Sequence, residues 1–324
     1  MCFKLTLLND SGKYSIEQLR SGGRRALARA ISAVENHSPG WIQLLKEIFP
    51  HTGRALTIGV TGAPGSGKST LVDQLAKIYR KRNRTVGVIA VDPTSPYSGG
   101  AILGDRIRMP EHFSDPGIYI RSMATRGWLG GLARATADVA LVLDAFGHDI
   151  VIIETVGVGQ DEIDIVRLAD VTVVILVPGM GDDVQTIKAG IMEIADIFVI
   201  NKSDYEGAER VEREIRALES LAVRQDPWTP SIVRTVATRG EGVEKLAEAA
   251  FEYEAHLHEH RSLERHRVVN WELRLVQMLR DSLLEQARAT VSDGDLRHFA
   301  EQIAERRRDP YSVIEEVEKR LRST

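Results

Sequence analysis

Hydrophobic residues follow two different patterns along the middle of the chain. Short continuous apolar runs, typical of strands buried in a parallel sheet, alternate with segments in which apolar residues recur at helical spacing. The first run is 55–60, and Leu71, Leu75 and Ile78 mark a helix over 71–82. Further strands are predicted at 85–91, 118–121, 149–154, 171–177, 197–200 and 232–237. This alternation predicts an α/β fold with a mostly parallel sheet over residues 54–255.

The two ends of the chain carry a helical pattern without predicted strands. Residues 1–53 have apolar residues at spacings that fit helix faces, and we expect a helical extension packed on the sheet domain. Residues 256–324 contain two further stripes, one of them at Trp271, Leu275, Met278, Leu279 and Leu283. Apolar stripes attached to a finished α/β domain invite self-association, and symmetric dimers are the commonest oligomers. We therefore expect a C-terminal helical arm that forms a homodimer.

The overall composition excludes several classes of protein. The chain has 324 residues, 43% of them hydrophobic and 27% charged, with a formal net charge of −4. This balance predicts no strong attraction to nucleic acid or to a membrane surface. Cys2 is the single cysteine, which rules out an internal disulfide and any Cys-x-x-Cys site. No apolar run approaches the 18 residues of a membrane span. We expect a cytoplasmic protein with neither nucleic acid nor membrane as its partner.

A glycine-rich motif joins the first predicted strand to the helix after it. Residues 62–69 read G-A-P-G-S-G-K-S, which fits the phosphate-loop pattern G-x-x-x-x-G-K-[ST]. In such a loop the glycines let backbone N–H groups converge on phosphate oxygens, Lys68 reaches the β- and γ-phosphates, and Ser69 offers its hydroxyl to Mg²⁺. The predicted phosphate-binding residues are Gly62, Ala63, Pro64, Gly65, Ser66, Gly67, Lys68, Ser69 and Thr70. The motif predicts a P-loop nucleotide-binding protein.

Acidic residues follow two later strands. Asp92 ends the second predicted strand and Asp105 lies in the long turn-rich segment after it; Glu154 ends the strand at 149–154. Ligands of open α/β sheets bind at the carboxyl ends of the strands, so these carboxylates and Ser69 are candidates to hold Mg²⁺ directly or through water. Gly157 stands three residues after Glu154, where a backbone N–H can meet the γ-phosphate. We predict that the segment after Glu154 is a nucleotide-sensing loop.

The sequence N-K-S-D at residues 201–204 follows the strand at 197–200. It matches N-K-x-D, in which the Asp accepts hydrogen bonds from guanine N1–H and the 2-amino group, the Lys stem covers the base, and the Asn ties this loop to the phosphate loop. Adenine offers no such donors, so Asn201, Lys202 and Asp204 favour GTP over ATP. The last predicted strand supplies a base-side loop at Val236, Ala237 and Thr238.

Taken together these motifs resemble the MeaB/ArgK family. The resemblance rests on the phosphate loop, on V-D-P-T-S-P-Y-S-G-G-A-I-L-G-D-R-I-R-M at 91–109, on E-T-V-G-V-G-Q at 154–160, on P-G-M-G-D-D-V-Q-T-I-K-A-G at 178–190 and on N-K-S-D. It covers roughly residues 15–255. The family comprises G-proteins that chaperone adenosylcobalamin-dependent acyl-CoA mutases, methylmalonyl-CoA mutase above all. It implies a SIMIBI-type G domain with GTP, GDP and Mg²⁺ as ligands.

The resemblance also implies a mechanism. It implies slow GTP hydrolysis by positioning and electrostatics, faster when a partner orders the loops, with Arg106, Arg108 and Lys188 as candidate cations. The mutase would read the GTP and GDP states as differences in loop order and thereby gate the loading of its cofactor, protecting or reactivating the enzyme. A cobalamin adenosyltransferase is a further candidate partner. The identity of the mutase, direct contact with cobalamin, the hydrolytic base and the dimer geometry stay open.

Three other functions are compatible with parts of this pattern. Metal-delivery GTPases of hydrogenase and urease maturation share the nucleotide-binding architecture, and a histidine cluster at His256, His258, His260 and His266 could hold a metal. A solvated helix face explains the same histidines, and no cysteine lies near the predicted switch loops. A kinase is disfavoured by N-K-S-D. The protein could also bind GTP as a static structural cofactor.

Overall fold

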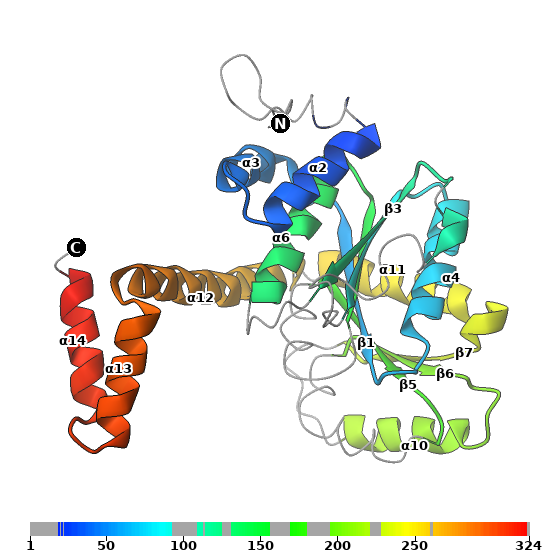
Figure 1. Ribbon diagram of the computed structural model, residues 1–324. Coiled ribbons are helices and arrows are strands. Elements are labelled where there is room, and N and C mark those ends of the chain that lie inside the picture. The colour runs from blue at the N-terminus through cyan, green and yellow to red at the C-terminus, as the bar shows by residue number, and fades with distance from the viewer. Residues whose placement is uncertain are drawn as a thin grey trace. The chain divides into compact units, whose positions relative to one another are not determined.

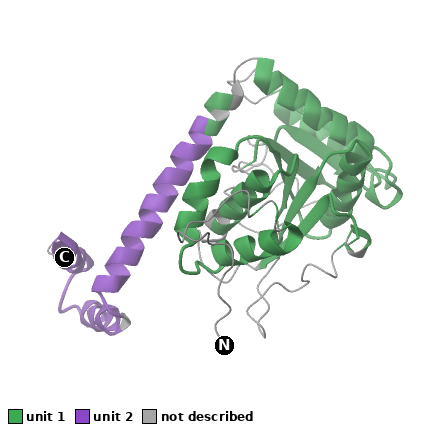
Figure 2. Ribbon diagram, turned by 90° about the horizontal axis from the view of Figure 1, so that it is seen from above, with its two compact units in different colours: residues 1–267 green, residues 268–324 purple. Residues whose placement is uncertain are grey.

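The computed structural model describes residues 19, 21, 23–92, 109–112, 114–124, 131–155, 169–179, 195–220, 228–259 and 262–322. The chain divides into two compact units, residues 1–267 and 268–324 (Figure 2). Each unit is described by itself below.

The first unit is built on a seven-stranded sheet (Figure 1). Its strands are β1 Leu56–Gly62, β2 Val86–Asp92, β3 Ile118–Ala124, β4 Ile150–Glu154, β5 Val171–Leu176, β6 Ile197–Asn201 and β7 Ser231–Thr235. They lie in the order β3-β2-β4-β1-β5-β6-β7, and every pair is parallel. The predicted α/β fold with a parallel sheet is confirmed. Because β1 is central, whatever follows it lies at the middle of the carboxyl edge.

Four predicted strands agree with the structure to within a residue at each end, and three differ. The strand predicted at 55–60 is β1 Leu56–Gly62, which continues two residues further. The strand predicted at 118–121 continues to Ala124, where it pairs along its whole length with β2. The strand predicted at 232–237 ends at Thr235, because Ala237–Arg239 forms the 3₁₀ turn η3 and Val236 makes an isolated antiparallel bridge with Glu241. The strand therefore ends earlier than predicted, and Val236, Ala237 and Thr238 all lie in the loop after it.

Helices cover both faces of this sheet. They are α2 Gly23–Glu35, α3 Trp41–Ile48, α4 Lys68–Lys81, α6 Gly131–Phe146, α10 Ala208–Glu219 and α11 Val243–Glu259, with the short turns η1 Phe49–His51 and η2 Pro110–His112. Neighbouring residues of one strand belong to different cores: Ile152 packs in the cluster with α4 and α11, and Ile153 in the cluster with α2, α3 and α6. Side chains of a strand point alternately to its two faces, so these clusters are the two cores of a covered sheet.

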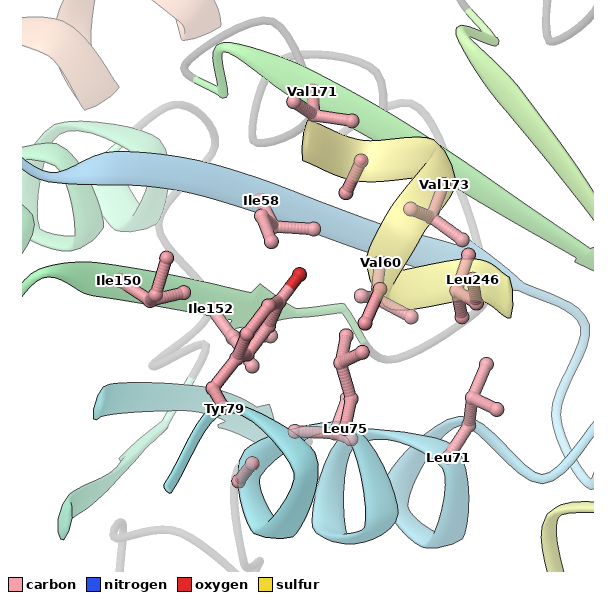
Figure 3. Packing of buried hydrophobic residues seen from close by; sticks show 14 of the residues in the cluster. Ile58, Val60, Leu71, Leu75, Tyr79, Ile150, Ile152, Val171, Val173 and Leu246 are labelled. Carbon is pink, nitrogen blue, oxygen red and sulfur yellow. The ribbon is translucent and has the colours of Figure 1, made fainter. Parts of the chain in front are cut away.

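The core beneath α4 fixes the helix that follows the phosphate loop. Leu71, Leu75 and Tyr79 of α4 lie against β-strand residues such as Ile58 and Ile152 (Figure 3). All five are almost fully buried. The Tyr79 hydroxyl makes no hydrogen bond with any described residue, although its side chain is completely buried. Apolar packing therefore sets the position of α4 and of its N-terminus.

The N-terminal helices belong to the core of the first unit. Leu27, Ile31 and Val34 of α2 are buried in the cluster that contains α6. An ion pair between Glu35 of α2 and Arg121 of β3 adds a polar contact to this packing. The helical extension predicted for the N-terminus is thus present over its described part, and it completes one face of the sheet.

The second unit is helical and small. It contains the greater part of α12 Ser262–Thr290, together with α13 Asp293–Ala304 and α14 Pro310–Arg322. Its buried apolar cluster consists of Val291, Phe299 and Val313, with Ile303 and Val317 partly buried around it. Ser292 and Asp295 form a capping box at the start of α13, which satisfies backbone N–H groups at that end.

Candidate nucleotide-binding site

Three glycines shape the loop between β1 and α4. Gly62, Gly65 and Gly67 have φ angles of +148°, +77° and +93°, a region that side-chain-bearing residues rarely adopt. A Cβ on Gly62 would lie 2.5 Å from the carbonyl oxygen of Ile175, and one on Gly67 would lie 2.4 Å from Nδ2 of Asn201. The loop conformation and its close packing against β5 and β6 therefore both require glycine.

Helix α4 begins directly after this loop, so its N-terminus faces the phosphate-loop motif. Gly67 is the N-cap residue, and it provides no side chain to accept hydrogen bonds from the first turn. Free N–H groups and the positive end of the helix dipole attract anions, phosphate in particular. Ser66 is 1% exposed, and its hydroxyl has no hydrogen-bond partner among the described residues. These donors suit a chain of phosphate groups.

The charged side chain of Lys68 is buried inside the phosphate loop. Its Nζ donates to the carbonyl oxygens of Gly62 at 2.6 Å and Ala63 at 3.0 Å. The residue is only 6% exposed. A buried ammonium group is stable only where polar atoms or an anion compensate its lost hydration, so the position suits phosphate binding.

Ser69 and Glu154 meet next to the phosphate loop. The Ser69 hydroxyl donates to Oε1 of Glu154 at 2.5 Å, and Glu154 is 3% exposed at the end of β4. Glu154 stands beside Val60 of β1 in the sheet register, which explains how a residue so distant along the chain reaches α4. A serine hydroxyl and a carboxylate are oxygen ligands of the type that Mg²⁺ prefers, so this pair fits a magnesium ion.

Several predicted site residues lie outside the described part of the chain. They are Asp105, Arg106, Arg108, Gly157 and Lys188. Asp92 ends β2 next to Ala124 of β3, but its side chain is likewise outside the described set. Their roles therefore stay predictions.

Asn201 connects three loops at the other end of the site. Its Nδ2 donates to the carbonyl oxygen of Ser66 at 2.7 Å, and its Oδ1 accepts from the Thr235 hydroxyl at 3.0 Å and from the backbone N–H of Ala237 at 3.1 Å. Asn201 and Thr235 are almost fully buried. The phosphate loop, the N-K-S-D segment and the last base-side loop are thus tied through one amide. Thr235 was not among the predicted site residues, since only its contact with Asn201 marks it.

Lys202 and Asp204 flank the space beside these loops. Lys202 has a positive φ of +54°, unusual for lysine, and its Nζ donates to the carbonyl oxygen of Gly65 at 2.9 Å. This brings the lysine stem across the phosphate loop, where a base would be covered. Asp204 is partly exposed, and its Oδ2 lies 3.3 Å from Nη2 of Arg239. Sequence motifs gave no signal for Arg239, because it follows Val236, Ala237 and Thr238 as an ordinary loop residue.

The described histidines of the C-terminal segment are not arranged as metal ligands. His256 stacks on Tyr253 and lies tilted beside Trp228, with its ring centre 5.1 Å from that of Trp228. Among the described residues, no group of three His, Cys, Asp or Glu side chains is close enough to hold a metal ion. The described histidines thus offer no observation in favour of a metal-delivery protein.

Comparisons with known proteins agree with this site. The family model "Methylmalonyl Co-A mutase-associated GTPase MeaB" matches residues 27–292. The chain belongs to the MeaB family. Family membership gives the chain the activity of a GTPase and guanine nucleotides as its ligands. The resemblance inferred from the motifs is confirmed, and it extends beyond the sheet into α12.

Individual relatives cover most of the chain. A putative GTPase of Pyrococcus abyssi is 47% identical over 94% of this chain and 95% of its own length. GTPase ArgK of Escherichia coli is 38% identical over 75% of this chain and 76% of its own. The mitochondrial methylmalonic aciduria type A homolog of Mus musculus is 36% identical over 78% of this chain and 68% of its own. A crystal structure of an LAO/AO transport system kinase superposes with a TM-score of 0.72 at 26% identity, covering 98% of both chains.

Within the described residues, no helix combines the length and the apolar character needed to cross a bilayer.

Proposed function

We propose that this GTPase is a chaperone of an adenosylcobalamin-dependent acyl-CoA mutase of the methylmalonyl-CoA mutase type. In this proposal, GTP binding and hydrolysis gate the loading of the mutase cofactor and protect or reactivate the enzyme. The name of the matched family and that of the mouse relative both point to methylmalonyl metabolism. The observation that carries the nucleotide part is the Asn201 side chain, which joins the phosphate loop to the N-K-S-D segment.

The described residues can position a guanine nucleotide along the carboxyl edge of the sheet. Backbone N–H groups of the phosphate loop and the Lys68 ammonium bind the phosphates, and Asp204 accepts from the guanine edge. Mg²⁺, held at Ser69 and Glu154 with Asp92 and Asp105 as further candidates, would neutralise charge on the β- and γ-phosphates. Since most of the catalytic effect in phosphoryl transfer is positioning and charge stabilisation, this set is sufficient for slow hydrolysis.

A fast intrinsic reaction is not expected from these residues. Glu154 is engaged by the Ser69 hydroxyl, so it is poorly placed to take a proton from water. Gly157, Arg108 and Lys188 are the remaining candidates for stabilising the transferred phosphoryl group. We propose that the mutase orders the segments that contain them, which raises the hydrolysis rate.

The nucleotide part is tested by exchanging one carboxylate for an amide. Asp204→Asn replaces an acceptor with a donor, so binding should move from guanine to xanthine, whose 2-oxo group accepts. We expect at least a tenfold loss of GDP affinity and a gain for xanthosine diphosphate, measured by calorimetry. Glu214→Gln on α10 is the matched control, because Glu214 forms an ion pair with Arg210 on the same helix. Unchanged GDP affinity in Asp204→Asn would contradict the proposed base site.

The chaperone part is tested by adding the partner. GTP hydrolysis is measured with the purified protein alone, with methylmalonyl-CoA mutase and with an unrelated acyl-CoA enzyme. We expect a low rate that rises only with the mutase, and no comparable turnover of ATP. A rate that ignores every acyl-CoA mutase, combined with nucleotide-dependent Ni²⁺ or Zn²⁺ binding, would favour metal delivery instead.

We also propose that the second unit forms a homodimer. Along α12, Val268, Leu275, Leu279 and Leu283 are each at least 54% exposed and recur at intervals that fit one helix face. Apolar side chains gathered on one face mark an interaction surface. A second copy of this chain carries the same stripe and can bury it symmetrically.

The dimer surface is tested by placing a charge in this stripe. Leu279→Glu should make the protein monomeric in light scattering, whereas the control Glu272→Gln should leave the dimer intact. A dimer that survives Leu279→Glu would contradict this surface.

A further inference from the structure

Arg239 forms an ion pair with Asp204, the carboxylate that the proposed base site needs. Its Nη2 lies 3.3 Å from Oδ2 of Asp204, and its Nε lies 2.8 Å from Oε1 of Glu241. The guanidinium therefore lies between two carboxylates, one on each side. Asp204 has to accept hydrogen bonds from a guanine edge, so the base and Arg239 compete for Oδ2 of this carboxylate.

The loop that carries Arg239 is well fixed. Arg239 donates its backbone N–H to Val236, Gly240 turns the chain with a φ of +71°, and Val236 pairs with Glu241 in an antiparallel bridge. Asn201 holds the same loop through the N–H of Ala237. Because the backbone is anchored on both sides, only the Arg239 side chain has to move for Asp204 to become free. Glu241 remains as its partner after such a move.

We infer that Arg239 is a gating residue of the base site, which holds Asp204 until a guanine base displaces it onto Glu241. This inference rests on the proposed guanine-binding role of Asp204. It adds a competing cation within the site, supplied by the loop after β7. Arg239 sets how easily guanine enters, and Glu241, its second anionic partner, favours the position of Arg239 in which Asp204 is free.

The expected effects follow from the exposure of the pair. The Arg239 and Asp204 side chains are 52% and 35% exposed, so water and salt screen their attraction. Exposed pairs of this kind correspond to about a twofold to fivefold change in an equilibrium constant. Arg239→Ala should therefore tighten GDP binding by about twofold to fivefold at low salt. The difference should vanish at about 0.5 M salt, where the Debye length is only a few ångströms.

Association kinetics separate this mechanism from a simple loss of charge. A GDP analogue with a fluorescent group on the ribose is mixed rapidly with each variant. Competition predicts faster association for Arg239→Ala, whereas loss of a steering cation would slow the association of an anionic ligand. Arg234→Ala is the matched control, because Arg234 on β7 makes an exposed ion pair of the same kind with Glu212. We expect Arg239→Ala to bind faster than both the wild type and Arg234→Ala.

Glu241→Gln should change GDP affinity in the opposite direction from Arg239→Ala. Without the Glu241 charge, Arg239 has Asp204 as its remaining anionic partner, so GDP binding should weaken by a similar factor. The double variant Arg239→Ala/Glu241→Gln should behave as Arg239→Ala does, because Glu241 acts only through Arg239. Weaker or unchanged GDP binding in Arg239→Ala would overturn the inference. Failure of the base site itself would appear differently, as wild-type protein that does not prefer GDP to ADP.

Discussion

The two compact units use their apolar side chains in opposite ways. In the first unit, apolar residues of the sheet and of its covering helices lie in cores on both faces, and Ile58, Ile152 and Phe198 are completely buried. In the second unit, a small cluster around Phe299 is buried, while Leu279 and Leu283 are 62% and 60% exposed. Burial removes apolar surface from water at about 25 cal/mol per Å², so the first unit accounts for most of the stability. The second unit retains exposed apolar surface along α12.

The largest difference should appear when one leucine is shortened in each unit. Leu75→Ala removes a side chain that is 1% exposed beneath α4 and should lower the free energy of unfolding by about 2–5 kcal/mol. Leu279→Ala removes one that is 62% exposed and should change it by less than about 1 kcal/mol in monomeric protein. Urea unfolding followed by circular dichroism measures both. Equal effects would contradict the contrast between the units.

A smaller effect is expected at the last residue of the first unit. Arg267 donates to both carboxylate oxygens of Asp170 and to the carbonyl oxygen of Gly53, and Asp170 is almost buried. Arg267→Gln should lower the free energy of unfolding of the first unit by about 1–3 kcal/mol, since it leaves a poorly hydrated carboxylate without its cation. The same urea experiment applies. Arg297→Gln, at an exposed helical pair, is the control and should have almost no effect.

Removing the buried hydroxyl of Tyr79 should raise the free energy of unfolding, whereas Leu75→Ala and Arg267→Gln should lower it. Burial raises the pKa of Tyr79 strongly, and the hydroxyl has no hydrogen-bond partner among the described residues (Figure 3). Tyr79→Phe should therefore stabilise the first unit by about 1 kcal/mol, because it removes an unpaired polar group from an apolar core. Thermal unfolding checks this. A loss of stability would indicate an internal partner, such as a buried water molecule.

The smallest expected effect is on how the free energy of unfolding depends on pH. Burial lowers the pKa of His148 below its ordinary value, because the ring is enclosed next to Phe146 and Tyr119. The unfolded chain then binds a proton at higher pH than the folded chain does, so stability is complete above about pH 6.5 and falls as the pH is lowered through and below that value. His148→Gln should flatten this part of the curve of unfolding free energy against pH. A curve that keeps its slope in the variant would assign it to another group.

Much of the first unit could be predicted from local patterns, and the limits have physical causes. The apolar runs and the phosphate loop depend on neighbouring residues, so β1, α4 and the parallel class of the sheet were predictable. The contact of Ser69 with Glu154 depends on strand order, which no local pattern contains. Arg239 lies outside every motif, and only the folded loop brings it to Asp204. The apolar stripes of the second unit were visible in the sequence, whereas only the structure shows that the α12 stripe is exposed.

The central position of β1 has a consequence for how the protein is made. β1 pairs with β4 and β5, which follow it only after two further strands and their helices. Contacts between residues far apart along a chain form slowly, because a long loop must close before any pairing energy is gained. During synthesis, the phosphate loop cannot take its final shape until Ile175 and later Asn201 have left the ribosome. The motif is therefore complete as sequence well before the contacts that shape its loop can form.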